Sequence, residues 1–126
     1  MYSNKMQERF NPGTDLTAHA EEAVTGKTFL RYAGAMKGGL ITVAPAKAGE
    51  AVAGVCKYDA KPHDLVGVAR GSSRIVTVTA AAALTAGTAV EVGTDGQAAP
   101  ASEGITVGWA VDNADKGNDA LISLAH

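Results

Sequence analysis

The sequence predicts an all-β fold: a small sandwich or barrel-like body with an internal pseudo-duplication, preceded by an extended N-terminal arm. Short runs rich in Val, Ile and Thr recur about every eight to twelve residues, separated by Gly, Asp or Pro, which is typical of β sandwiches and barrels. Several motifs return about 55 residues further along the chain, which indicates two related units. Ala, Gly, Val and Thr make up half of the 126 residues, and only 5% are aromatic. Such small residues suit thin strands and tight turns better than the walls of a substrate pocket.

The first 22 residues differ in character from the rest. They are mostly polar, and Pro12-Gly13 would end any helix begun before it. Three larger apolar residues, Tyr2, Met6 and Phe10, stand four apart, too few to order the segment by themselves. We therefore divide the chain into an extended arm at 1–22 and a β-rich domain at 23–126. A frayed terminus is the alternative interpretation of the arm.

Eight strands are expected after the arm, several with a period-two alternation of apolar and polar residues. They are Lys27–Tyr32, Leu40–Val43, Ala51–Tyr58, Leu65–Arg70, Arg74–Thr79, Thr88–Val92, Ile105–Val111 and Ala120–Leu124. Asp95-Gly96 predicts a tight turn, since glycine accepts a positive φ without penalty. A short helix is the expectation for Ala80–Leu84.

The repeat predicts two β modules, at about 24–66 and 85–124, joined by 70–84. The motifs that carry it are turn formers and strand starters. The matched pairs are Ala44-Pro45-Ala46 with Ala99-Pro100-Ala101, Gly49 with Gly104, Gly54-Val55-Cys56 with Gly108-Trp109-Ala110, Asp59-Ala60 with Asn113-Ala114, Asp64-Leu65-Val66 with Asp119-Ala120-Leu121, and Thr25-Gly26 with Ala86-Gly87. The expected body is pseudo-symmetric, without a cleft between unlike halves.

Charge and cysteine content exclude several classes of protein. Eleven Lys and Arg against thirteen Asp and Glu leave no basic face for nucleic acid. No apolar run is long enough to span a membrane, and the polar N-terminus does not resemble a secretory signal. The single cysteine, Cys56, permits no internal disulfide, and synthesis in a reducing cytosol is expected. Oligomerisation remains as a source of added stability.

Catalytic and metal-binding motifs are scarce, so we expect no catalytic residue, cofactor or metal. Cys56 could act as a nucleophile beside His63, but its place in an apolar strand favours a small core residue. Asp59, His63 and Asp64 could hold a metal, but their segment is more typical of a polar connection with a proline turn. Residues 112–119 are superficially similar to a calcium loop. Ala114 and Lys116 stand where ligand oxygens would be needed, which predicts an ordinary turn.

Lys37 supports a second hypothesis about function. The triplet Ala35-Met36-Lys37 resembles the attachment motif of biotinyl carrier domains, which are also small pseudo-symmetric β sandwiches. Gly38 replaces the apolar residue that normally follows the lysine, and no glutamate precedes the triplet. A glycine-rich surface loop with a solvated lysine is the competing interpretation.

Trp109 is the only tryptophan, in an apolar strand beside Val107 and Val111. Alternation along the strand predicts that the three side chains share one face. This pattern favours a core anchor for Trp109, with an interface anchor as the alternative.

Taken in order, these segments resemble the small β-rich capsid decoration, or cement, proteins of tailed bacteriophages. The likeness covers about residues 20–126. The segments that carry it are Ala23–Phe29, Gly49–Val55 leading to Tyr58–Ala60, Ala86–Val92 with Asp95-Gly96, Val107–Ala110, and Ala120–Leu124.

The resemblance implies a non-enzymatic structural protein of the virion, made in the bacterial host cytoplasm. Such proteins bind the outside of an assembled, expanded shell, often as trimers at three-fold and quasi-three-fold positions, and stabilise it against internal DNA pressure. The implied partners are the major capsid protein and two further copies of the chain, without direct contact to nucleic acid or membrane. A biotinyl-type carrier with Lys37 as attachment site is the alternative, and an adhesive surface module is a third possibility.

The arm is the expected contact with the shell. We expect Tyr2, Met6 and Phe10 to pack into subunit seams, or the arm to add a strand, when it orders on the capsid. Lys5 and Arg9 would then pair with acidic residues of the shell. Repetition of weak contacts around a symmetric shell supplies avidity.

Overall fold

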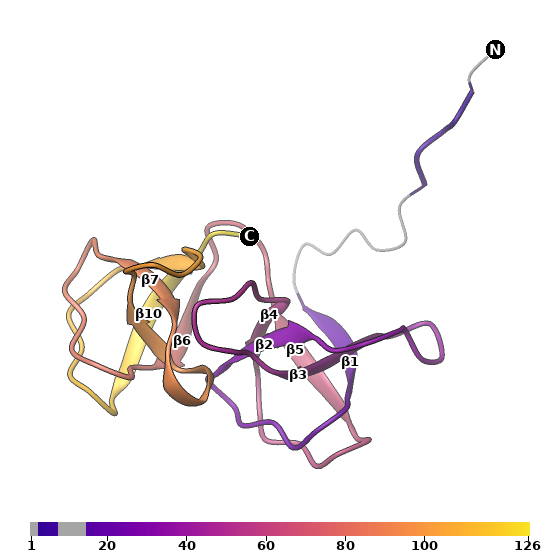
Figure 1. Cartoon of the computed structure of the whole chain (residues 1–126), viewed down its shortest axis with the longest axis horizontal. Helices are drawn as coiled ribbons and strands as arrows, with labels where there is room; N and C mark the ends of the chain where they lie inside the picture. The colour runs from indigo at the N-terminus through magenta and orange to yellow at the C-terminus, as the bar shows by residue number, and fades with distance from the viewer. Residues whose placement is uncertain (1–2, 8–14) are drawn as a thin grey trace.

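The computed structural model describes residues 3–7 and 15–126 and folds the chain into two five-stranded modules (Figure 1). The first module, β1–β5, comprises β1 Leu16–Ala20, β2 Phe29–Tyr32, β3 Ile41–Pro45, β4 Gly54–Cys56 and β5 Leu65–Ala69. The second module, β6–β10, comprises β6 Ile75–Thr79, β7 Ala89–Val92, β8 Ala98–Pro100, β9 Gly108–Ala110 and β10 Asp119–Leu124, with a 3-10 turn at Thr94–Gly96. The predicted all-β class is confirmed.

The first module is a closed barrel with strand order β1-β3-β2-β4-β5. Neighbouring strands are antiparallel except β1 and β3, which run parallel with Ala20 opposite Val43. The barrel interior is filled by small and medium apolar side chains, among them Leu30, Val43 and Val66, all fully buried. Alternation along each strand sends every second side chain inward, which is why lean Val- and Ala-rich runs suffice to fill it.

The second module repeats this arrangement strand for strand. Read around the closed barrel from β1 in the other direction, the first module has the order β1-β5-β4-β2-β3, and the sheet of the second module has the corresponding order β6-β10-β9-β7-β8. A single parallel bridge from Ala80, directly after β6, to Ala98 in β8 takes the place of the β1–β3 pairing. Val90 lies opposite Gly108 and Pro100, as Leu30 lies opposite Gly54 and Pro45. The internal pseudo-duplication is therefore present at the level of individual residue pairs.

The registers also correct two of the predicted motif matches by one residue. The amide of Ala20 donates to Asp64 O and that of Ala80 to Asn118 O, so Asp64 corresponds to Asn118 and not to Asp119. Likewise Gly26 corresponds to Ala86, because the two amides donate to the side-chain oxygens of Asp59 and Asn113. The predicted matches of Ala44–Ala46 and of Asp59-Ala60 hold. The sequence-based alignment was one residue out of register because neighbouring Ala and Asp residues offer equivalent matches, whereas hydrogen bonds fix a single register.

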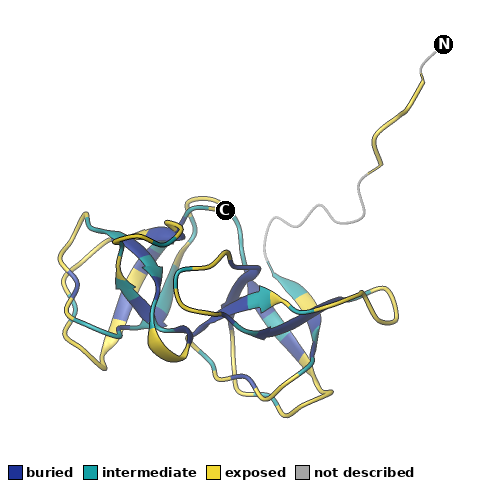
Figure 2. Cartoon of the chain, viewed as in Figure 1, coloured by how far each residue is buried: buried dark blue, intermediate teal, exposed yellow. Residues whose placement is uncertain are grey.

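One end of the second module packs against the outer side of the first module. Phe29, Val55 and Ala69 are buried side chains of the first module, yet they belong to the apolar cluster that fills the second module. The backbone joins the modules as well: the amide of Gly49 donates to Val92 O at 2.8 Å, and the amide of Thr79 to the carbonyl of Lys27 at 2.9 Å. Figure 2 shows buried strand segments within both modules. A single apolar cluster therefore ties the halves together.

Three segments of the structure differ from the prediction. Leu16–Ala20 is a barrel strand, so the predicted boundary of the arm at residue 22 is too late. Ala80–Leu84 is not a helix, because Ala80 and Leu84 are both held in bridges to other segments. Ala98–Pro100 is an unpredicted strand. All three are alanine-rich or lack β-branched runs, so their conformation is decided by their neighbours.

The predicted turn at Asp95-Gly96 is confirmed. Both residues have positive φ, 56° and 72°, and connect β7 to β8. In the first module the corresponding turn between β2 and β3 is longer, spans residues 33–40 and carries positive φ at Gly38 and Gly39. This hairpin projects from the side of the first module that lies away from the second (Figure 1).

Candidate interaction surface

The second module exposes an apolar face on its outer side, on β6, β10, β9 and β7. Ile75 lies opposite Ser123, Ser123 opposite Trp109, and Trp109 opposite Ala89, so these side chains form one row across four strands. Leu121 lies in the next row beside Val111, whose amide donates to Leu121 O at 2.9 Å. We call Ile75, Ser123, Trp109, Leu121 and Val111 the Trp109 face.

Four large apolar side chains on this face are exposed. The exposed fraction is 56% for Ile75 and 44% for each of Trp109, Leu121 and Val111. They lie on adjacent strands and form a contiguous apolar surface around the small Ser123, a combination typical of interaction sites. The sheet therefore presents a tryptophan, the residue most often found at the energetic centre of protein interfaces.

Trp109 is therefore not the core anchor that its apolar neighbours in the sequence predicted. Val107 is buried while Trp109 and Val111 point outward, so the three residues do not share a face. The reason is that β9 begins at Gly108, so Val107 lies outside the regular alternation of the strand. The position fits the alternative, an interface anchor.

The corresponding face of the first module is covered. Phe29, Val55 and Ala69 occupy the positions of Ala89, Trp109 and Ser123, and all three are buried against the second module. The same side of the repeated unit is therefore an interface in one module and is exposed in the other.

The first module also carries exposed apolar residues at its far end. Tyr32, at the end of β2, is 53% exposed, and Met36, in the hairpin that follows, is 43% exposed. The hydroxyl of Tyr32 accepts a hydrogen bond of 2.9 Å from Arg70, which holds the ring in place. We call Tyr32 and Met36 the hairpin end of the first module.

Lys37 lies on the same hairpin, directly before the tight Gly38-Gly39 turn. Its backbone is bridged to Leu40 on the other side of the turn. Its ammonium group pairs with Glu21 at 2.7 Å, so the lysine predicted as a biotin attachment site is engaged in an ion pair. In the carrier hypothesis the lysine would need to swing freely with its cofactor.

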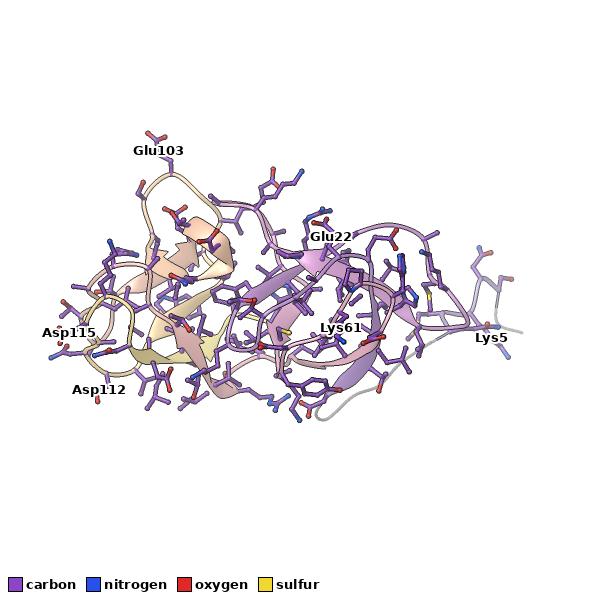
Figure 3. The ribbon with its side chains drawn as sticks, turned by 90° about the horizontal axis from the view of Figure 1, so that it is seen from below. Lys5, Glu22, Lys61, Glu103, Asp112 and Asp115 are labelled. Atoms are coloured by element: carbon purple, nitrogen blue, oxygen red, sulfur yellow. The ribbon has the colours of Figure 1, made fainter. Side chains whose placement is uncertain are left out.

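The predicted capsid-contact residues fall partly outside the described chain. Tyr2, Arg9 and Phe10 are not among the described residues. Residues 3–7, which include Lys5 and Met6, are exposed and lie apart from the modules (Figure 1; Lys5 is labelled in Figure 3). The side chain of Met6 is 77% exposed.

An ion cluster fastens the start of β1, immediately after the N-terminal segment. Asp15 accepts hydrogen bonds from the ammonium of Lys57 and, at 2.8 Å, from the guanidinium of Arg74. Arg74 lies in the linker between the modules and also donates to Arg70 O. The hydrogen bonds from Lys57 and then Arg74 hold the pKa of Asp15 below its usual value.

We expect Asp15→Asn to lower the free energy of unfolding by about 1 kcal/mol at pH 7. Because the pKa is depressed in the folded state, the stabilisation is present above the unfolded value near 3.9 and is lost as pH falls through the folded value. Urea unfolding at pH 7 and at successively lower pH measures this difference, which should shrink as Asp15 becomes protonated in the folded state. Asp115→Asn, at an exposed position, is the matched control. Equal stabilities at pH 7 would contradict the role of the cluster.

The residues considered for catalysis or metal binding do not assemble into a site. The thiol of Cys56 is buried and donates to Tyr58 O at 3.1 Å, and burial raises its pKa. The ring of His63 lies 6.0 Å from that of His19, centroid to centroid, so the structure pairs it with another histidine and not with Cys56. The side chain of Asp59 accepts a hydrogen bond of 2.8 Å from the amide of Gly26, a residue of a distant segment.

Acidic residues elsewhere are equally dispersed. Asp112 and Asp115 point outward from the far end of the second module (Figure 3), where residues 112–118 form the predicted turn. Within residues 3–7 and 15–126, no group of three or more His, Cys, Asp or Glu could hold a metal ion. In the same part of the chain, no helix has the length and apolar character to cross a membrane.

Sequence reasoning missed most of the Trp109 face and the Asp15 cluster. A comparison of the repeats at the correct register would have shown them. Asp15 and Lys57 of the first module correspond to Ile75 and Val111 of the second, so charged residues in one module are replaced by apolar ones in the other.

Comparison with known proteins identifies the fold. No protein-family model matches the chain. None of the curated proteins matches it either. Among solved structures, the fold is similar to that described as the crystal structure of head fiber gp8.5 N base in bacteriophage phi29. The TM-score is 0.74 at 23% sequence identity, over 88% of this chain and 92% of the other.

Proposed function

We propose that this chain is a non-enzymatic structural protein of a bacteriophage virion. It binds the outer surface of the assembled capsid and stabilises it, as a homotrimer at three-fold and quasi-three-fold positions. Its partners are the major capsid protein and two further copies of itself. The observation that carries the proposal is the two-module fold shared over nearly the whole of both chains with the base of a phage head fiber.

The surface of the molecule supports a role in assembly. Exposed apolar side chains gather on the sheet face around Trp109 and on the hairpin end at Tyr32 and Met36. Exposed apolar surfaces that carry a tryptophan suit contacts with other proteins better than the recognition of a small molecule. The Cys56 thiol and the His63 ring are each engaged elsewhere, so they do not form a nucleophile and base pair.

Binding to capsids tests the proposal directly. Purified chain is mixed with expanded capsids of the encoding phage that lack it, and the pelleted protein is measured by co-sedimentation. We expect saturable binding and a higher temperature of DNA release from filled particles. Capsids that neither retain the chain nor gain thermal stability would contradict the proposal.

In this proposal the N-terminal segment makes the contact with the shell. The effect of deleting the segment is a separate prediction. Because Leu16–Ala20 is a barrel strand and Asp15 fastens its start, the deletion ends at residue 14. We expect the chain without residues 1–14 to bind capsids at least about tenfold more weakly, since the loss of one anchoring segment is multiplied over many sites.

The deletion is compared with the point variant Met6→Ser, which keeps the length of the segment and removes one exposed apolar contact. Thermal unfolding of both should match that of the intact chain, because residues 3–7 lie apart from the modules. Undiminished binding by the deleted chain would overturn the role of the segment and leave the capsid-binding proposal standing.

A further inference from the structure

The two modules contribute different surfaces to the contact between them. Each of these two surfaces has an uncovered counterpart in the other module, at one end of the molecule. The first module contributes its outer side, with Phe29, Val55 and Ala69. The second module contributes its end, where the β7–β8 turn approaches so closely that a side chain on Gly96 would begin 3.1 Å from Phe29 O. The outer side of the second module and the hairpin end of the first are the corresponding surfaces.

The outer side of the second module has the composition of a covered surface. Where the first module is left uncovered by its neighbour, it carries the ion-paired Asp15 and Lys57. At the same positions the second module carries Ile75 and Val111, 56% and 44% exposed. Replacement of paired charges by exposed apolar side chains favours a protein partner over water at these positions.

The hairpin end of the first module matches the other side of the contact. Val92 of the second module, whose carbonyl accepts the hydrogen bond from Gly49, corresponds to Tyr32 of the first. Val92 is 1% exposed, but Tyr32 is 53% exposed because no neighbouring module covers it. The longer β2–β3 hairpin adds Met36 and lies on the side of the molecule opposite the second module (Figure 1).

We propose that the Trp109 face of one copy binds the hairpin end of the first module of the next copy, so that the contact between modules continues from chain to chain. The occupant is a second copy because the chain itself carries both sides of the contact and joins them once internally. Such a head-to-tail contact is heterologous, and it closes into a ring when the rotation allows it. This inference rests on the proposed function for the closed trimer and names the surfaces that form it.

Two substituted chains test the surfaces. The side variant, Trp109→Lys with Leu121→Thr, removes the Trp109 face, and the end variant, Tyr32→Lys with Met36→Ser, removes the hairpin end. Light scattering coupled to gel filtration should give three times the 12.7 kDa chain mass for the unmodified chain and the mass of a single chain for each variant. Leu65→Thr, exposed on the first module, is the control and should keep the trimer mass. Circular dichroism and thermal unfolding confirm that each variant is folded.

Mixing the two variants separates head-to-tail from symmetric association. Each variant retains one intact surface, and the two intact surfaces are complementary. We therefore expect an equimolar mixture to form a dimer of one chain of each kind that cannot grow further. A mixture that stays monomeric, a side variant that keeps the trimer mass, or an unmodified chain that is monomeric at high concentration would each overturn the inference.

The test of this contact and the test of the proposed function can fail separately. Co-sedimentation with capsids, measured on the same samples, reports capsid binding independently of mass. A trimer abolished by the side variant, combined with no capsid binding by the unmodified chain, would support the contact and refute the function. Capsid binding by a monomeric unmodified chain would refute the contact and the trimeric state and would support binding to the capsid.

Discussion

Replacing Phe29 with alanine should lower the free energy of unfolding by about 3–5 kcal/mol. Phe29 is fully buried and joins the apolar cluster that the two modules share. Its removal leaves a cavity between the modules, lined by side chains that have no other way to fill it. Urea denaturation followed by circular dichroism measures the change.

The control for this variant is Leu65→Ala, which removes a side chain that is 55% exposed and should cost less than about 1 kcal/mol. Tryptophan fluorescence distinguishes loss of the interface from global unfolding, because Trp109 reports only on the second module. If Phe29→Ala unfolds at the same urea concentration as the unmodified chain, packing of Phe29 between the modules does not stabilise the fold.

Gly108→Ala should destabilise the chain by about 3 kcal/mol or more, as should its counterpart Gly54→Ala. A Cβ on Gly108 would lie 2.6 Å from Ser123 O and 2.7 Å from a methyl of Ile122. A Cβ on Gly54 would lie 2.6 Å from both Ala69 O and a methyl of Val68. Backbone atoms cannot move aside as the end of a flexible side chain can, so the strands must separate.

Gly38→Ala is the comparison for these two variants. Gly38 has φ of +57° and open space around its Cβ position, so the substitution costs only backbone strain, about 1–2 kcal/mol. Thermal unfolding of the three variants should rank Gly38→Ala as the most stable. Equal losses for all three would show that close approach of the strands is not what these glycines provide.

Much of the fold could be read from local patterns. The eight predicted strands all overlap strands of the structure, because β-branched runs between turn residues leave few other conformations. Asp95-Gly96 forms the predicted turn because its two positive φ angles suit these residue types. The repeat was visible because Ala44–Ala46 and Gly54 recur at positions where geometry leaves little choice.

Other parts could not be read in this way. Leu16–Ala20 has one β-branched residue, Thr17, beside leucine, histidine and two alanines, and becomes a strand because β3 and β5 offer it unpaired backbone groups on both sides. Ala98–Pro100 is a strand for the same reason beside β7. Asp15 gains its role only because folding brings Lys57 and Arg74 to it from distant segments.

The sequence by itself determined the all-β class and the turns, because both depend on residue types within a few positions of one another. It also determined the repeat, because the same turn and strand motifs return about 55 residues further along the chain. Only the tertiary structure decided which face of each module is covered. Trp109 and Val55 occupy the same position in the repeated sheet, yet one is 44% and the other 2% exposed. No local pattern can distinguish them, because burial depends on whether another module lies against the face, and that is set by how the two halves pack.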